Sequence, residues 1–171
     1  LKDSPIIMGV KEIPPRLLES NKTYVFFSHT IKGQPANMPM LRRIVELGCT
    51  LIDYERIVDE KGRRLVFFGT FAGLAGMIDT LWALGQRLKL DGIETPFAQV
   101  RRAFEYHDVQ HAKDEIAAIG QRIARDGLPD AVQPFICGFA GYGNVSQGAQ
   151  QIFDLLPVRT LSPGELDQAK P

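Results

Sequence analysis

The first 55 residues alternate short apolar runs with one segment of helical periodicity, and this alternation constrains the fold more than any other feature. Apolar or aromatic runs occupy residues 5–11, 23–29 and 50–55, and polar or charged residues close each of them. Between the second and third runs, apolar residues recur at helical spacing over 36–48. Strands that alternate with helices favour a layered fold with parallel strands. We therefore predict an α/β fold with a Rossmann-like parallel sheet.

The rest of the sequence predicts another strand, two helices and the beginning of a second α/β unit. We expect a strand over 63–69, a long helix over 70–90 and a more polar helix over about 107–125. A buried strand over 134–140 then leads into a glycine-rich loop, a helix and a strand over 158–161. A dinucleotide-binding unit needs more strands than these, so we expect a truncated nucleotide domain, cut from a longer protein. The predicted domains are a substrate-domain portion, a helical connector and the start of a Rossmann nucleotide-binding domain, at residues 1–98, 99–130 and 131–171.

Composition excludes several other classes of protein. Hydrophobic residues make up 44% of the chain and charged residues 23%, which is typical of globular domains and not of disordered chains. The 20 basic residues balance the 20 acidic ones, so no overall field attracts nucleic acid or an anionic membrane, and we expect neither as a partner. Two cysteines, Cys49 and Cys137, match neither a zinc site nor a disulfide framework. We expect buried thiols, no metal and a reducing cytoplasm.

The glycine-rich segment is the first candidate binding site. Gly141, Gly143 and Gly148 lie between a predicted strand and a predicted helix, with Ser146 as the one substitution in a dinucleotide fingerprint. Glycine lets the backbone turn tightly and approach a pyrophosphate, and the helix N-terminus offers unpaired N–H groups and a partial positive charge. The alternative is a glycine-rich turn that binds nothing.

Lys11 and His29 form a candidate proton-transfer pair. Each lies at the C-terminal end of a predicted parallel strand, where α/β folds bind their ligands. Histidine titrates near neutral pH and neighbouring cations lower the pKa of a lysine, so the pair can move protons on an amine or an imine. Asp53 and Glu55, at the end of the third strand, either adjust these two pKa values or cap a loop. The alternatives are a hydrogen-bonded loop histidine and a solvated lysine.

A polar, mostly basic cluster is the third candidate. Two consecutive arginines, Arg63 and Arg64, enter a predicted strand, and Lys32 and Gln34 follow the histidine. Guanidinium groups bind carboxylates and phosphates through paired hydrogen bonds, so the arginines can hold a substrate carboxylate and a cofactor phosphate. The alternative is a basic surface turn.

Six segments, taken together and in order, resemble one enzyme family. They are residues 7–12 (IMGVKE), 26–35 (FFSHTIKGQP), 51–55 (LIDYE), 62–64 (GRR), 68–69 (FG) with 72–77 (AGLAGM), and 141–149 (GYGNVSQGA). They resemble the saccharopine-forming lysine–2-oxoglutarate reductase domain of aminoadipate semialdehyde synthase. That domain groups with the saccharopine dehydrogenases in the alanine dehydrogenase and nicotinamide nucleotide transhydrogenase class.

The resemblance implies an NAD(P)-dependent oxidoreductase of lysine metabolism, which condenses lysine with 2-oxoglutarate to form saccharopine or runs the reverse reaction. It implies that Lys11 accepts a proton and that His29 donates one. The implied substrate contacts are Lys32, Gln34, Arg64 and Phe68. The implied cofactor contacts are Arg63, Gly141, Gly143, Asn144, Val145 and Gly148.

The resemblance also bears on cofactor, partners and location. No acidic residue follows the strand predicted over 158–161 until Glu165, which favours NADP(H) over NAD(H). The family's first strand–helix–strand segment would precede residue 1, so we expect the missing parts of the parent chain as partners. We expect a mitochondrial matrix location if the parent is eukaryotic. The alternatives are an amino-acid dehydrogenase with another substrate and a non-catalytic nucleotide-binding regulatory domain.

Overall fold

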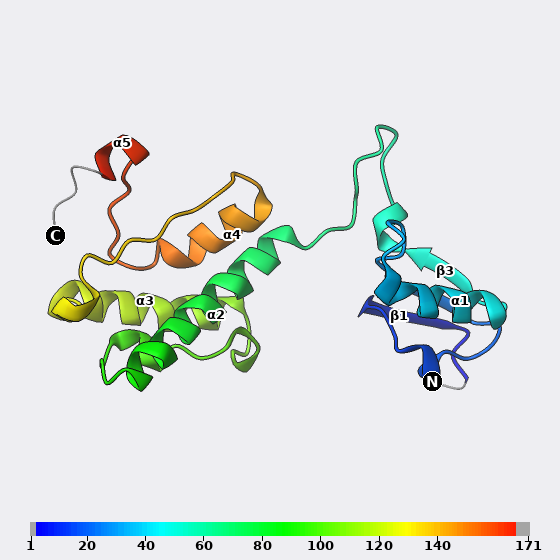
Figure 1. Ribbon diagram of the computed structural model, residues 1–171, viewed down its shortest axis with the longest axis horizontal. Coiled ribbons are helices and arrows are strands. Elements are labelled where there is room, and N and C mark those ends of the chain that lie inside the picture. The colour runs from blue at the N-terminus through cyan, green and yellow to red at the C-terminus, as the bar shows by residue number, and fades with distance from the viewer. Residues whose placement is uncertain (1–2, 167–171) are drawn as a thin grey trace. The chain divides into compact units, whose positions relative to one another are not determined.

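The computed structural model describes residues 3–166 and divides the chain into two compact units, Leu1–Phe67 and Phe68–Pro171 (Figure 1). The first unit contains a parallel sheet and the second is helical. The predicted α/β class is therefore confirmed. None of the helices in the described part of the chain has the length and apolar character needed to cross a membrane.

Three parallel strands form the sheet of the first unit, in the order β1 (Ile6–Lys11), β2 (Thr23–Phe27) and β3 (Thr50–Asp53). The central strand carries aromatic and β-branched residues, which suit a buried strand with a neighbour on each side. Its residue Tyr24 lies opposite Ile7 of β1 and Leu51 of β3. Because all three strands run in one direction, their carboxyl ends meet at one edge of the sheet.

One helix, α1 (Met38–Glu46), connects β2 to β3 and packs against the sheet. Its apolar residues Met40 and Ile44, four positions apart, are buried with Tyr24 and Phe26 of β2. Gly48 follows the helix with a φ of +63°, a left-handed conformation that turns the chain towards β3. Short 3-10 helices complete the unit: η1 (Pro15–Leu17), η2 (Pro35–Asn37) and η3 (Tyr54–Arg56).

The second unit is built from α2 (Gly69–Leu90), α3 (Val109–Asp126), α4 (Asn144–Phe153) and the short α5 (Pro163–Leu166). Three 3-10 helices lie between them: η4 (Pro96–Gln99), η5 (Ala103–Glu105) and η6 (Asp130–Val132). One apolar core joins α2, α3 and α4 through side chains such as Leu81, Ile116 and Ile152. Residues 68–98 thus belong to this compact unit. The domain limits expected at residues 98 and 130 stay a prediction.

Helices α2 and α4 contact each other directly at two glycines. A Cβ atom on Gly73 would lie 2.0 Å from the Val145 carbonyl oxygen, and one on Gly148 would lie 2.1 Å from the Thr70 carbonyl oxygen. No real side chain fits at such distances, so glycine at both positions lets the two backbones pack together.

Three predicted strands are wrong. Residues 63–69 form only one isolated antiparallel bridge, between Val58 and Arg64, before α2 begins. Residues 134–140 and 158–161 are extended or irregular without strand pairing. Apolar sequence favours a strand, but a strand also needs a hydrogen-bonded neighbour, and the described residues of the second unit provide none.

The predicted burial of the cysteines is wrong for Cys137 and holds only in part for Cys49. Cys137 is exposed, because the segment around it does not enter a sheet. Cys49 is half-buried, and its thiol donates to the Glu19 carbonyl oxygen at 3.1 Å.

Candidate active site

Lys11 and His29 meet at the carboxyl edge of the sheet. Lys11 ends β1, and His29 follows β2 by two residues. The Lys11 Nζ atom lies 3.1 Å from the His29 Nε2 atom, a hydrogen-bonding distance. The parallel topology therefore brings together the two residues that the sequence selected as a proton-transfer pair.

Two glutamates flank the histidine ring. The Glu12 carboxylate lies 4.0 Å from His29 Nε2, and the Glu55 carboxylate lies 4.0 Å from His29 Nδ1. The imidazole thus has a carboxylate near each of its two ring nitrogens. Glu12 was not among the predicted site residues, although its position directly after Lys11 at a strand end was an available signal.

Glu55 connects the histidine to an arginine. Its side chain is only 8% exposed, and its Oε1 atom lies 2.7 Å from Arg64 Nη2. The Arg64 side chain is 47% exposed, so it pairs with a buried carboxylate while part of its guanidinium group faces solvent. A buried carboxylate needs such a partner, because an unpaired buried charge is costly.

The other predicted residues of the basic cluster lie apart from this pair. Arg63 Nε lies 2.7 Å from Asp59 Oδ2, in the turn that connects the two residues of the isolated bridge, and the Arg63 side chain is 75% exposed. Hydrogen bonds from the Arg63 backbone N–H and guanidinium lower the pKa of Asp59 below its usual value. Lys32 and Gln34 are exposed in the loop between β2 and η2.

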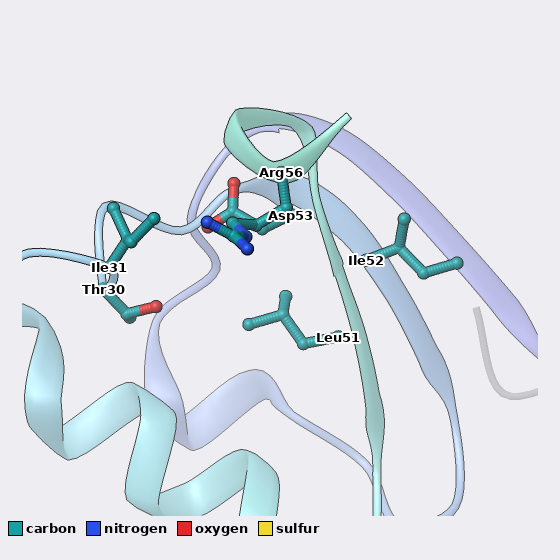
Figure 2. Close-up of a pocket in the computed structure, with 6 residues that line it drawn as sticks. All are labelled: Thr30, Ile31, Leu51, Ile52, Asp53 and Arg56. Carbon is teal, nitrogen blue, oxygen red and sulfur yellow. The ribbon is translucent and has the colours of Figure 1, made fainter. Parts of the chain in front are cut away.

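An open hollow of about 450 Å³ lies beside the histidine loop in the first unit (Figure 2). Apolar side chains and the polar groups of three residues line it: Thr30, Ile31, Leu51, Ile52, Asp53 and Arg56. Of these, the sequence analysis had singled out only Asp53. The hollow lies next to His29 in the chain, because Thr30 directly follows the histidine.

The glycine loop lies in the second unit. Gly141 has a φ of +96°, and Gly143 is the N-terminal cap of α4 without a capping side chain. A Cβ atom on either glycine would meet no neighbour within 4 Å, so the loop surface is open. Asn144 and Val145 begin the helix, and their backbone N–H groups have no intrahelical acceptor. This open loop at a helix N-terminus fits a pyrophosphate, although the strand predicted before it is absent.

The two remaining predicted residues, Phe68 and Gly148, lie near the contact between α2 and α4. Phe68 is the residue before α2, and its side chain is 45% exposed. A Cβ atom on the adjacent Gly69 would lie 3.1 Å from Asn144 Cβ, so the start of α2 lies next to the start of α4. Gly148 is buried against α2.

The chain is similar to one protein family and to two groups of known proteins. Residues 1–75 match the family described as alanine dehydrogenase/PNT, N-terminal domain. The chain is 42% identical over 168 residues to the alpha-aminoadipic semialdehyde synthase of Arabidopsis thaliana and to the mitochondrial one of Rattus norvegicus. These alignments cover 98% of the chain but only 16% and 18% of the two relatives, so the chain spans less than a fifth of their length.

A second group of relatives matches a shorter region. The saccharopine dehydrogenase [NAD(+), L-lysine-forming] of Neurospora crassa is 36% identical over 94 residues. That alignment covers 53% of the chain and 25% of the relative.

Proposed function

Residues 1–75 belong to the alanine dehydrogenase/PNT N-terminal domain family, and from this premise we propose that the chain carries the proton-transfer site of a lysine-metabolising oxidoreductase. The similarity to aminoadipic semialdehyde synthases and to saccharopine dehydrogenases supports an enzyme of this general class. The single observation that supports the proposal most directly is the 3.1 Å contact between Lys11 Nζ and His29 Nε2.

The proposed reaction joins the ε-amine of lysine to the keto carbon of 2-oxoglutarate, with loss of water and reduction of the resulting C=N bond to give saccharopine. The reverse reaction uses the same groups. Nicotinamide dinucleotide, when bound, supplies or accepts the hydride. The chain must then remove a proton from the lysine ammonium group and supply a proton to the oxygen that leaves as water.

Lys11 and His29 suit these two proton transfers. The Lys11 Nζ and His29 Nε2 atoms lie 3.1 Å apart, so the two groups can act on neighbouring atoms of one substrate. We assign the proton acceptor to Lys11 and the proton donor to His29, as the resemblance implies. Glu12 and Glu55 offset the positive charge that the pair carries.

Arg64 is proposed to bind a substrate carboxylate. One nitrogen of its guanidinium pairs with Glu55, while the half-exposed remainder can form a bidentate pair with a carboxylate. Lys32 and Gln34, exposed in the loop after His29, and Phe68 complete the proposed substrate contacts.

The glycine loop is proposed to hold the dinucleotide. The backbone N–H groups of Asn144 and Val145, with the open glycines Gly141 and Gly143, would bind its pyrophosphate, and Arg63 would contact a phosphate. We propose NADP(H) as the preferred form. Glu165, the first acid after residues 158–161, accepts hydrogen bonds from the Ser162 hydroxyl and N–H at 2.6 and 2.7 Å.

The proposed location follows the source of the parent protein. The rat, mouse and bovine relatives are named as mitochondrial proteins. We propose the mitochondrial matrix for a eukaryotic parent and the cytoplasm otherwise.

A chimaera tests the proposed function. This chain replaces the matching segment of the Arabidopsis synthase, and NADPH oxidation is measured with lysine and 2-oxoglutarate. We expect turnover that requires both substrates. We also expect Lys11→Met and His29→Gln each to lower this turnover strongly. If both variants turn over at the rate of the unmodified chimaera, the proposed function is wrong.

A further inference from the structure

His29 has a backbone conformation that its surroundings must hold in place. Its φ is +52°, in the left-handed region that residues other than glycine rarely adopt. Among the described residues, the only other non-glycine residue with positive φ is Asn21. A rare conformation of this kind persists when neighbouring contacts fix the chain on both sides.

Asn37 fixes the carbonyl groups on both sides of that conformation. Its side-chain amide donates to the Ser28 carbonyl oxygen at 3.1 Å and to the His29 carbonyl oxygen at 3.5 Å. Asn37 ends η2 and immediately precedes α1, so it connects the histidine loop to the start of the helix.

Asp53 fixes the residue before the histidine. The Ser28 hydroxyl is fully buried and donates to Asp53 Oδ2, while it also accepts from the Thr30 N–H at 3.2 Å. The ends of β2 and β3 are therefore joined by one buried side-chain hydrogen bond. Asp53 itself is 8% exposed.

The same carboxylate also positions the glutamate beside the histidine. Asp53 Oδ1 accepts from the Glu55 N–H at 2.8 Å and thereby caps η3. One oxygen of Asp53 thus restrains the chain before His29, and the other restrains the chain at Glu55. The imidazole and the carboxylate that faces its Nδ1 atom are held by one buried group.

We propose that Asp53 and Asn37 are positioning residues that hold the His29 imidazole between Lys11 and Glu55. Neither residue needs to touch substrate. A proton donor must lie within hydrogen-bonding reach of its target, so a small displacement of the ring reduces turnover. The expected effect on turnover rests on the proposed function, whereas the placement of the His29 ring by Asp53 and Asn37 does not.

The first test measures the position of the ring in the 171-residue chain by NMR, with ¹⁵N-labelled histidine. The chain has only three histidines, so the signals of His29 are readily assigned with a His29→Gln variant. We expect Asn37→Ala and Asp53→Asn each to shift the His29 ring signals and to remove the nuclear Overhauser contact between His29 and Lys11. An asparagine at 53 keeps one acceptor oxygen and cannot serve both Ser28 and Glu55.

The control variant for this test is Asp59→Asn. Asp59 also accepts backbone N–H bonds in a turn of the same unit, from Lys61 and Arg63. We expect the His29 signals to stay unchanged in this variant. If Asp53→Asn unfolds the unit, the Asn37→Ala variant alone tests the inference, because Asn37 is only half-buried and its loss is less disruptive. Unchanged His29 signals and an intact Lys11 contact in folded Asn37→Ala would overturn the inference.

The second test measures turnover in the chimaera. We expect Asn37→Ala to lower kcat by about tenfold or more while the substrate KM changes little, because the ring moves but the substrate contacts remain. Unchanged turnover in Asn37→Ala, in a chimaera that His29→Gln inactivates, would overturn the positioning role. Full turnover in His29→Gln would instead contradict the proposed function, and the NMR result would still decide whether the ring is held.

Discussion

Arg63 and Arg64 are adjacent in sequence but pair with different carboxylates, Arg63 with Asp59 at 2.7 Å and Arg64 with Glu55 at 2.7 Å. In an extended segment successive side chains point to opposite sides, so two neighbouring arginines reach two separate places. Arg64 joins the buried carboxylate beside His29, and Arg63 joins an exposed turn. Because the two arginines reach different places, we expect Arg63→Ala and Arg64→Ala to have different effects.

Arg64→Ala should weaken capture of a carboxylate substrate. A charge-assisted hydrogen bond contributes about 1.5–3 kcal/mol, which corresponds to a rise in substrate KM of about 10- to 150-fold. Arg63→Ala is the matched control and should raise the KM for the dinucleotide instead. Both values are measured in the chimaera by steady-state kinetics. If Arg64→Ala leaves both substrate KM values unchanged, Arg64 belongs to a surface turn and not to the site.

Lys11→Met and His29→Gln should each lower kcat in the chimaera by roughly 10²- to 10⁴-fold, the usual contribution of a general acid or base. Substrate binding, measured by equilibrium titration, should change much less. The pH–rate profile supplies a second readout, because removing one group removes one of its limbs. If both variants keep the turnover and the pH–rate profile of the unmodified chimaera, Lys11 and His29 have a structural role and transfer no proton.

The 171-residue chain alone should show no NADPH oxidation with lysine and 2-oxoglutarate. A dinucleotide-binding fold holds its ligand at the edge of a sheet, and the described residues of the second unit contain no strand. The assay is a spectrophotometric time course at high protein concentration, with the chimaera as the positive control. Sustained turnover by the chain alone would refute this prediction.

The chimaera should prefer NADPH to NADH. The Ser162 hydroxyl and N–H both donate to Glu165 Oε2, so this acid is engaged with Ser162 at the start of α5. The ratio of kcat/KM for the two dinucleotides measures the preference. A clear preference for NADH would show that Glu165, or another acid of the nucleotide site, holds the ribose.

Gly148→Ala should destabilise the second unit, because the new Cβ atom would lie 2.1 Å from the Thr70 carbonyl oxygen. Forced repacking of this kind costs about 1–3 kcal/mol. Gly76→Ala is the matched control, since a Cβ atom there meets nothing within 4 Å and alanine favours a helix interior. Urea unfolding should show a lower midpoint for the first variant and an equal or higher one for the second. Equal midpoints for Gly148→Ala and the parent chain would contradict the packing argument.

The periodicity of apolar residues predicted the helices and strands whose formation depends on the local sequence. Helices α1, α2 and α3 carry strong periodicity, and β1 to β3 combine apolar runs with polar ends, so their positions agree with the prediction to within a few residues. The 134–140 segment has the same apolar character but no partner strand, and a sequence pattern does not contain that information.

In the candidate site, too, one part was predictable from the sequence and another was not. The Lys11–His29 contact was predictable, because parallel strands bring their carboxyl ends together. The supporting bonds of Asp53, Ser28 and Asn37 depend on side-chain rotamers and on a left-handed residue at 29, for which the sequence offers no signal such as a glycine.

The close contact of α2 and α4 changes what the glycine fingerprint says about evolution. Gly148 fills a packing requirement, so selection for a stable fold would preserve it in a descendant that had lost nucleotide binding altogether. Gly141 meets no neighbour, and substitution there would cost only its own backbone conformation. Across related proteins, loss of Gly141 with retention of Gly148 would therefore identify members that keep the helical packing but lack the loop proposed to bind the dinucleotide.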